Sequence, residues 1–228
     1  TTTAATASTR ALPLIVSDNG ITDDSPFDKD PTTARLAEPS WTRAKIAEWL
    51  PLSLRMSKMD LIYSTNFHGR TLESLYRHCR KAKHTIMMVE PIDQGCEYHA
   101  VGMYASQTWQ ASSRVYGDGE CFLFRLGQDG SNLSQRWKWK PKGKCDVLEE
   151  EGIETNNKIA LLEQFQVGTN EYISMGGNQD GSAGLRLNED LTKAETSTAA
   201  GFDNDALVSS GLFEVGLLEV YQLVPLYG

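Results

Sequence analysis

The chain has 228 residues, of which 40% are hydrophobic, and a formal net charge of −8. This composition is typical of a soluble globular protein, and no window approaches the roughly 20 consecutive apolar residues of a membrane span, so we expect no direct membrane insertion. The acidic balance argues against nucleic acid as a partner, because a phosphate polyanion would be repelled.

The first 40 residues differ in composition from the rest of the chain. They begin with the low-complexity run TTTAATASTRA and continue with Asp, Pro, Ser and Thr. Such a segment buries too little apolar surface to offset the entropy of ordering it. We therefore predict a flexible or extended N-terminal tail over residues 1–40 and a single domain over residues 41–228.

The domain opens with helical patterns. Ser40 is a plausible N-cap for a helix that Pro51 ends, because apolar residues recur at helical spacing between them. A strand at Leu61–Tyr63 and a turn follow, and Thr71 is expected to cap a second helix. His84–Glu90 and Tyr98–Ala105 then read as two strands that pair as neighbours.

The middle of the chain contains two further strand patterns. Tyr116–Leu126 has apolar residues at successive positions, as expected of a strand covered on both faces. Arg136–Lys140 alternates, with Trp137 and Trp139 on one face, which suits an edge strand with a charged outer side. Residues 142–157 carry an acidic cluster and are predicted to form an insertion loop.

A hairpin and a long final strand complete the pattern. Tyr172–Met175 and Gly184–Leu187 are strand-like runs joined by a glycine-rich turn. Lys193–Asp205 is rich in Thr, Ala, Asn and Asp and is predicted to be loop, and Phe213–Val224 to be a strand. These elements predict a mainly-β α+β fold, a two-sheet antiparallel β-sandwich flanked by a few helices.

No set of residues forms a convincing catalytic or metal-binding pattern. Cys96 and His99 have a possible zinc-ligand spacing, but the other candidate ligands fall on separate strands and a helix. Asn178-x-Asp180-Gly181 imitates part of a calcium loop without its first ligand. Ser64 with His68 lacks a strained nucleophile elbow. We therefore predict no metal, no cofactor and no catalytic residue.

The cysteines point to a reducing compartment. The chain has four of them without a CxxC pair, and a disulfide framework is not expected at this size, so the location is predicted to be cytoplasmic. A redox role would need an exposed thiolate with a low pKa. Cys79 is the best candidate for such a thiol, because it lies beside His78 and Arg80.

Five runs in order resemble a known family, the TLDc domain family. They are Leu61–Tyr76, Val101–Tyr104 with Trp109, Tyr116–Leu126, Tyr172–Leu191 and Phe213–Tyr221. The sequence departs from the family pattern at Met59, where a tryptophan is usual, and at Arg186, where an aromatic residue follows Gly-Leu. The resemblance implies a two-sheet sandwich bordered by helices.

The resemblance also implies a function without chemistry. TLDc proteins are associated with oxidative stress resistance and with binding to the vacuolar-type proton ATPase (V-ATPase), whose assembly they are proposed to modulate. It therefore implies a protein–protein interaction domain with V-ATPase subunits as partners, in the cytoplasm at the surface of an acidic organelle or within a large assembly. Glu120, Gly176 and Gly177 match family positions and are candidate partner-binding residues.

Two other functions are open. The long Thr/Ala/Pro-containing tail could thread across neighbouring chains, which would make the protein a structural building block of a cytoskeletal or organellar assembly. A redox or hydrolytic enzyme is the third alternative, with Cys79 and His68 as the residues to test.

Overall fold

The computed structural model describes residues 16–17, 36–112, 114–128, 132–140, 165–178 and 180–226. Within these ranges, eleven strands form one hydrogen-bonded sheet that is accompanied by three α-helices and one 3₁₀-helix. The helices are α1 (Ser40–Trp49), η1 (Leu52–Leu54), α2 (Thr65–His68) and α3 (Leu72–Cys79). The strands are β1 (Val16–Ser17), β2 (Ser57–Ser64), β3 (Thr85–Ile92), β4 (Tyr98–Ala105), β5 (Phe122–Gly127), β6 (Gln135–Lys138), β7 (Gln166–Gly168), β8 (Tyr172–Gly177), β9 (Ala183–Asn188), β10 (Lys193–Glu195) and β11 (Leu212–Pro225).

The last strand, β11, holds the sheet together. One of its edges pairs with β3, whereas β10 and β2 pair with its first and second parts respectively. The register with β3 shifts between Val215 and Leu218, and such a bulge lets a strand bend. The strand order is β6-β5-β4-β3-β11-β10-β9-β8-β7, with β2 beside β11 off this path. The predicted mainly-β antiparallel fold with few helices is confirmed.

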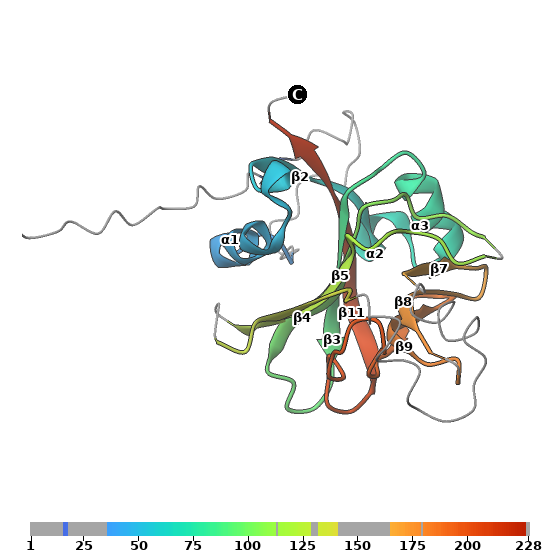
Figure 1. Cartoon of the computed structure of the whole chain (residues 1–228). Helices are drawn as coiled ribbons and strands as arrows, with labels where there is room; N and C mark the ends of the chain where they lie inside the picture. Colours follow the sequence, from blue (N-terminus) through green and yellow to red (C-terminus); the bar gives the residue numbers. More distant parts are fainter. Residues whose placement is uncertain are drawn as a thin grey trace, which may run out of the picture.

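The main hydrophobic core lies between the two wings of this sheet. Met87, Met103 and Leu123 from the β3–β5 wing pack in one cluster with residues of the β8–β9 wing such as Met175. The approach is close, because a Cβ atom on Gly184 of β9 would stand 2.3 Å from Leu123 Cδ1. Figure 1 shows α3 and the strands β7–β9 on one side of β11, and α1 on the other.

A second core covers the outer face of the β3–β5 wing. Ile46 of α1 and Leu50, which follows α1, pack in a cluster with β-strand residues that include Ile86 and Phe124. Strand β5 is therefore covered on both faces, as its continuous apolar run predicted. Leu36 also belongs to this second core, so packing begins before the predicted domain start at residue 41.

Three local predictions have clear outcomes. Thr71 does cap α3, since its Oγ1 accepts a hydrogen bond from the Ser74 N–H at 3.2 Å. The N-cap prediction for Ser40 was wrong, because Ser40 is the first helical residue and Pro39 precedes it without a side-chain cap. The loop predicted over Lys193–Asp205 was wrong at its start, where β10 is held by pairing with both β9 and β11 despite its weak strand propensity.

Several other expectations concern the ends and the surface. Part of the predicted tail, β1, pairs in parallel with Met59 and Asp60 of β2. The predicted acidic loop over 142–157 lies outside the described residues.

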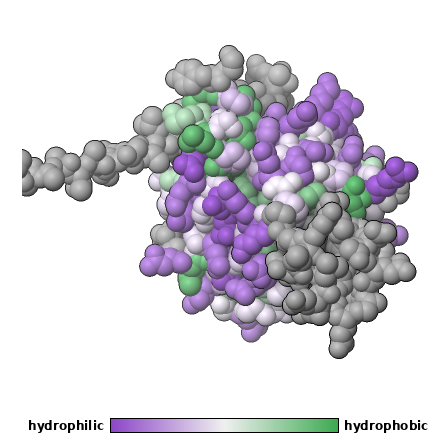
Figure 2. Space-filling model, in the orientation of Figure 1, coloured by the Kyte–Doolittle hydropathy of each residue, from purple (hydrophilic) through white to green (hydrophobic). Residues whose placement is uncertain are grey.

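Strand β6 pairs with β5 alone among the described strands, as expected of an edge strand. None of the helices in the described ranges has the length and apolar character of a membrane span. Figure 2 shows a largely hydrophilic face with hydrophobic atoms gathered near η1, where Leu52 is 80% exposed.

Candidate interaction cleft

A cleft of about 520 Å³ opens at the end of the sheet where β3 and β5 begin and β4 ends. We call it the polar cleft, because every residue that lines it is polar or charged. They are Lys83, His84, Ser106, Gln107, Thr108, Gln110, Asp118 and Glu120. Three separate segments of the chain supply them, and pairing of Thr85 with Ala105 and of Tyr104 with Phe122 brings these segments together.

His84 forms one part of the wall and is fixed by its backbone. It has a φ of 52°, a left-handed conformation that is unusual for a non-glycine residue. Its N–H donates to the Ser106 carbonyl at 3.2 Å, and its own carbonyl accepts from the Leu223 N–H at 2.8 Å. The ring Nδ1 lies 3.0 Å from the Tyr104 hydroxyl, so this imidazole is oriented by a buried partner.

Asp118 and Glu120 form the acidic part of the wall. Asp118 Oδ1 accepts from the Ser106 hydroxyl at 2.6 Å and from the Glu120 N–H at 3.0 Å, which closes the turn before β5. The Glu120 side chain is exposed. Burial, and then the charges of Glu120 and Asp118, raise the pKa of Tyr104 above its usual range, so this hydroxyl stays protonated.

The cleft contains the residue types of a hydrolase triad in the wrong arrangement. A nucleophilic serine needs a histidine base that is itself oriented by an acid. Here Ser106 donates directly to Asp118, while the His84 Nδ1 is engaged by Tyr104. Neither hydrogen bond places a base on the serine hydroxyl, so the observed arrangement does not activate a nucleophile.

The two candidate glycines lie outside the cleft. Gly176 has a φ of 75°, and a Cβ atom there would meet the Ala199 Cβ at 2.9 Å. Its N–H donates to the Phe165 carbonyl at 3.3 Å. Gly177 pairs with Ala183 across the β8–β9 hairpin. Chain geometry and close packing thus account for both glycines, and Glu120 alone of the three predicted partner-binding residues faces the cleft.

Cys79 lies in the main core with a fully buried side chain. Burial raises the pKa of its thiol to about 12, whereas a redox-active cysteine needs an accessible thiolate near neutral pH. Burial also raises the pKa of the Cys121 and Cys96 thiols. The structure therefore counts against Cys79 as a redox thiol, and Cys145 lies outside the described residues.

The Ser64–His68 pair has a structural arrangement. The backbone N–H of Ser64, not its hydroxyl, donates to His68 Nδ1 at 3.0 Å, and the Ser64 Oγ caps α2 through the Asn66 N–H. The ring centroids of His68 and His78 are 4.1 Å apart. Burial, with the nearby charges of His78 and Arg77, lowers the pKa of His68 to about 4, so the ring is neutral at pH 7.

The metal-like spacings do not assemble into a ligand set. His99 Nε2 lies 2.9 Å from the Leu36 carbonyl, which can only accept, so this nitrogen carries a proton. Asp180 uses Oδ1 to accept from both the N–H and the hydroxyl of Ser182, which closes the β8–β9 turn. In the part of the chain that the structure describes, no three His, Cys, Asp or Glu side chains group as metal ligands would.

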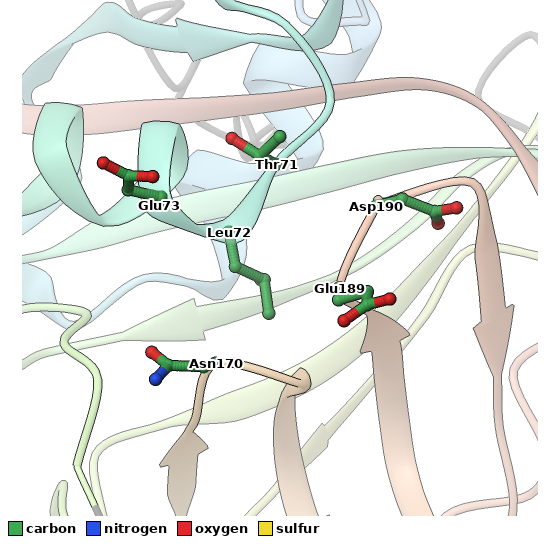
Figure 3. A pocket seen from close by; sticks show the side chains of 6 residues that line it. All are labelled: Thr71, Leu72, Glu73, Asn170, Glu189 and Asp190. Atoms are coloured by element: carbon green, nitrogen blue, oxygen red, sulfur yellow. The ribbon is translucent and has the colours of Figure 1, made fainter.

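A second hollow, of about 560 Å³, lies between the start of α3 and the turns that follow β7 and β9 (Figure 3). Its acidic residues are Glu73, Glu189 and Asp190. The Asp190 carboxylate already accepts an internal hydrogen bond, from the Thr192 hydroxyl to Oδ1 at 2.6 Å. This hydrogen bond is the main cause of the lowered pKa of Asp190. This hollow offers carboxylates without any opposing cation, so it is a weaker candidate than the polar cleft.

Comparison with known proteins settles the family. The sequence model described as the TLDc domain matches residues 35–224 of this chain. The chain belongs to the TLDc domain family. The match begins one residue before Leu36, which belongs to the second core of this TLDc domain.

Related proteins carry the TLDc domain within longer chains. TBC1 domain family member 24 of Xenopus laevis is 24% identical over 211 residues, covering 77% of this chain and 36% of its own length. The GTPase-activating protein skywalker of Drosophila melanogaster is 27% identical over 186 residues, covering 77% and 28% respectively. Oxidation resistance protein 1 of Podospora anserina is 25% identical over 198 residues, covering 79% and 57%. The chain thus spans about a third of the length of the first two relatives.

Sequence reasoning identified one wall residue of the cleft and missed most of the others. Glu120 was singled out because it matches a family position, whereas Lys83, Ser106 and Gln107 carry no recognisable motif. Their proximity depends on the β3-β4-β5 pairing, which brings chain segments up to 37 residues apart to one sheet end. The available signal was the polar residues beside the strand ends there, before β3 and β5 and after β4.

Proposed function

We propose that this TLDc domain is a non-catalytic interaction module that binds and regulates a large protein complex, the V-ATPase, in the context of protection against oxidative stress. One observation supports this most strongly. A cavity lined only by polar and charged residues gathers acid–base side chains, yet His84, Ser106 and Asp118 are committed to structural hydrogen bonds, while Glu120 is left exposed.

The lining of the cleft favours a protein partner. Small-molecule sites are mostly apolar with a few polar groups, whereas every lining residue here is polar or charged. Charged, solvent-exposed groups of this kind are typical of the rim of a protein interface, where they set association rate and specificity. The name of one relative, oxidation resistance protein 1, supports the link to oxidative stress.

The test is affinity purification of the endogenous protein followed by quantitative mass spectrometry. We expect V-ATPase subunits to be enriched about tenfold or more over a mock purification from cells that lack the tagged chain. Because charged rim contacts are weakened by salt, this recovery should fall when the wash is raised from low to high ionic strength. Recovery of no ATPase subunit at low salt would remove this partner.

The structural-building-block alternative has one observation in its favour. The tail residues Val16–Ser17 add a parallel strand beside β2, which shows that this segment can pair with a sheet edge. A permanent subunit would co-purify with the same neighbours at high salt and in fixed stoichiometry. A regulatory partner would be lost under that wash, so one salt series separates the two functions.

A further inference from the structure

The polar cleft carries opposite charges on two sides of one strand. Lys83 precedes β3, and Asp118 and Glu120 precede β5, while the end of β4 lies between these two strands. Neighbouring strands are about 4.8 Å apart, so the backbones that carry Lys83 and Glu120 stand roughly 10 Å from each other. The cleft is thus polarised across the width of β4, with a cation on one side and carboxylates on the other.

The two outermost charges are available to a partner. Lys83 and Glu120 are both exposed, and neither side chain makes a hydrogen bond or ion pair to another residue that the structure describes. Asp118, in contrast, already accepts hydrogen bonds from the Ser106 hydroxyl and the Glu120 N–H at Oδ1 and from Gln107 Nε2 at Oδ2. Lys83 also follows the exposed Arg80 and Lys81, which strengthen the positive side.

This polarity excludes partners with a single sign of charge. A polyanion such as a nucleic acid or an anionic membrane meets Asp118 and Glu120, and a uniformly basic peptide meets Lys83 and its basic neighbours. A segment with both signs satisfies both sides. Gln107 Nε2 donates to Asp118 Oδ2 at 3.4 Å, whereas the exposed side chain of Gln110, which also lines the cleft, can donate to and accept from the backbone of an extended chain.

We propose that the polar cleft binds an extended segment of a protein partner that carries one acidic and one basic side chain in a fixed order. The acidic side chain pairs with Lys83 and the basic one with Glu120. An extended chain rises about 3.3 Å per residue and only alternate side chains share a face, so the two side chains are two or four residues apart, about 7 or 13 Å. This inference rests on the proposed role of the domain in protein binding, and it specifies the chemistry of the partner.

The test is selection from a displayed library of short random peptides, with the full chain as bait. The wild-type protein is compared with Lys83→Glu, Glu120→Lys and the double variant Lys83→Glu/Glu120→Lys, which keeps the net charge and reverses the polarity of the cleft. The matched control is Glu171→Lys/Lys193→Glu, an equivalent exchange between two exposed residues of a different hollow. None of these side chains makes a described hydrogen bond, so the variants should fold.

The wild-type protein and the control should enrich peptides with an acid and a base in one order, and the double variant should enrich the reverse order. One enriched peptide should bind each single variant about tenfold more weakly than it binds wild type, with a reduced salt dependence. Identical enrichment by wild type and the double variant, or enrichment without a charge order, would overturn the inference. Because the readout uses peptides alone, loss of the V-ATPase as partner leaves this test intact.

Discussion

Two regions that carry family motifs use their polar groups in opposite ways. At what we call the Arg70 corner, formed by His68 and Arg70, the Arg70 guanidinium donates to the carbonyls of Leu191 and Val215 at 3.0 Å each, and to that of Gly216. These carbonyls lie at the register shift of β11 and at the turn before β10. In the polar cleft, Glu120 makes no comparable side-chain bond and faces outward.

The comparison distinguishes side chains that stabilise the fold through hydrogen bonds from side chains that are exposed to a partner. A bulge leaves carbonyl groups without sheet partners, and a buried carbonyl without a donor is costly. Arg70 supplies those donors, so the corner is needed for β11 to serve both wings of the sheet.

The largest effect is expected for Arg70→Ala. It removes three charge-assisted hydrogen bonds to main-chain carbonyls and should lower the free energy of unfolding by about 4 kcal/mol, measured by urea denaturation. Arg77→Ala is the control, since exposed Arg77 makes a single described bond to Ser74 at 3.3 Å and should change stability by less than about 0.5 kcal/mol. Equal effects of the two variants would contradict a special role for Arg70.

The second prediction compares two glycines with left-handed backbones. Gly176→Ala should cost about 3 kcal/mol, from a φ of 75° and from contact with Ala199 and Phe202. Gly181→Ala should cost only about 1 kcal/mol, because it has a φ of 83° but nothing within 4 Å of the added Cβ. If both cost the same by denaturation, packing at Gly176 is not what requires a glycine there.

The third prediction concerns pH and the Arg70 corner. The pKa of His68 is lowered to about 4 in the folded chain, so between pH 6.5 and pH 4 the unfolded chain binds a proton that the folded chain does not. The free energy of unfolding therefore has its full value above pH 6.5 and decreases as the pH falls toward 4. After allowance for partial exposure, we expect a loss of about 2 kcal/mol.

His68→Gln should remove most of this pH dependence of the unfolding free energy. Parallel denaturation series at pH 7 and pH 4.5 on wild type and variant provide the measurement. An unchanged slope in the variant would show that other groups cause the acid sensitivity.

The smallest effect is expected at Cys79. With a thiol pKa of about 12, its thiolate fraction at pH 7 is about a thousandfold below that of a free cysteine. Iodoacetamide should label the half-buried Cys96 and leave Cys79 unmodified in the folded chain, as read by mass spectrometry. Labelling of Cys79 in denaturant is the control. Rapid labelling in the native state would restore Cys79 as a redox candidate.

Much of the fold could be predicted from local patterns, and the reasons are specific. The apolar run at Phe122–Leu126 indicated a strand buried on both faces, and the glycines after Met175 indicated a hairpin. Strand β10 could not be predicted, because Lys193–Glu195 is held by pairing partners on both sides and not by its own propensity.

The site was harder to predict than the fold. Local sequence does not report that Lys83 and Glu120 end up beside the same strand, since long-range register decides it. The bulge of β11 between Val215 and Leu218, which lets one strand pair within both wings, also left no signal in the apolar pattern. Motif matching selected Glu120, Gly176 and Gly177 alike. Only the structure shows that Glu120 is exposed at the cleft, whereas chain geometry and close packing account for the glycines.

The most direct test of the central claim measures partner recovery and stability on the same set of variants. Wild type, Lys83→Glu/Glu120→Lys and Glu171→Lys/Lys193→Glu are expressed at equal levels, and recovery of V-ATPase subunits is quantified with the unfolding free energy of each chain. The account predicts that the cleft variant loses about tenfold in recovery while its stability stays within about 0.5 kcal/mol of wild type, and that the control loses neither. Undiminished recovery with the reversed cleft would contradict it.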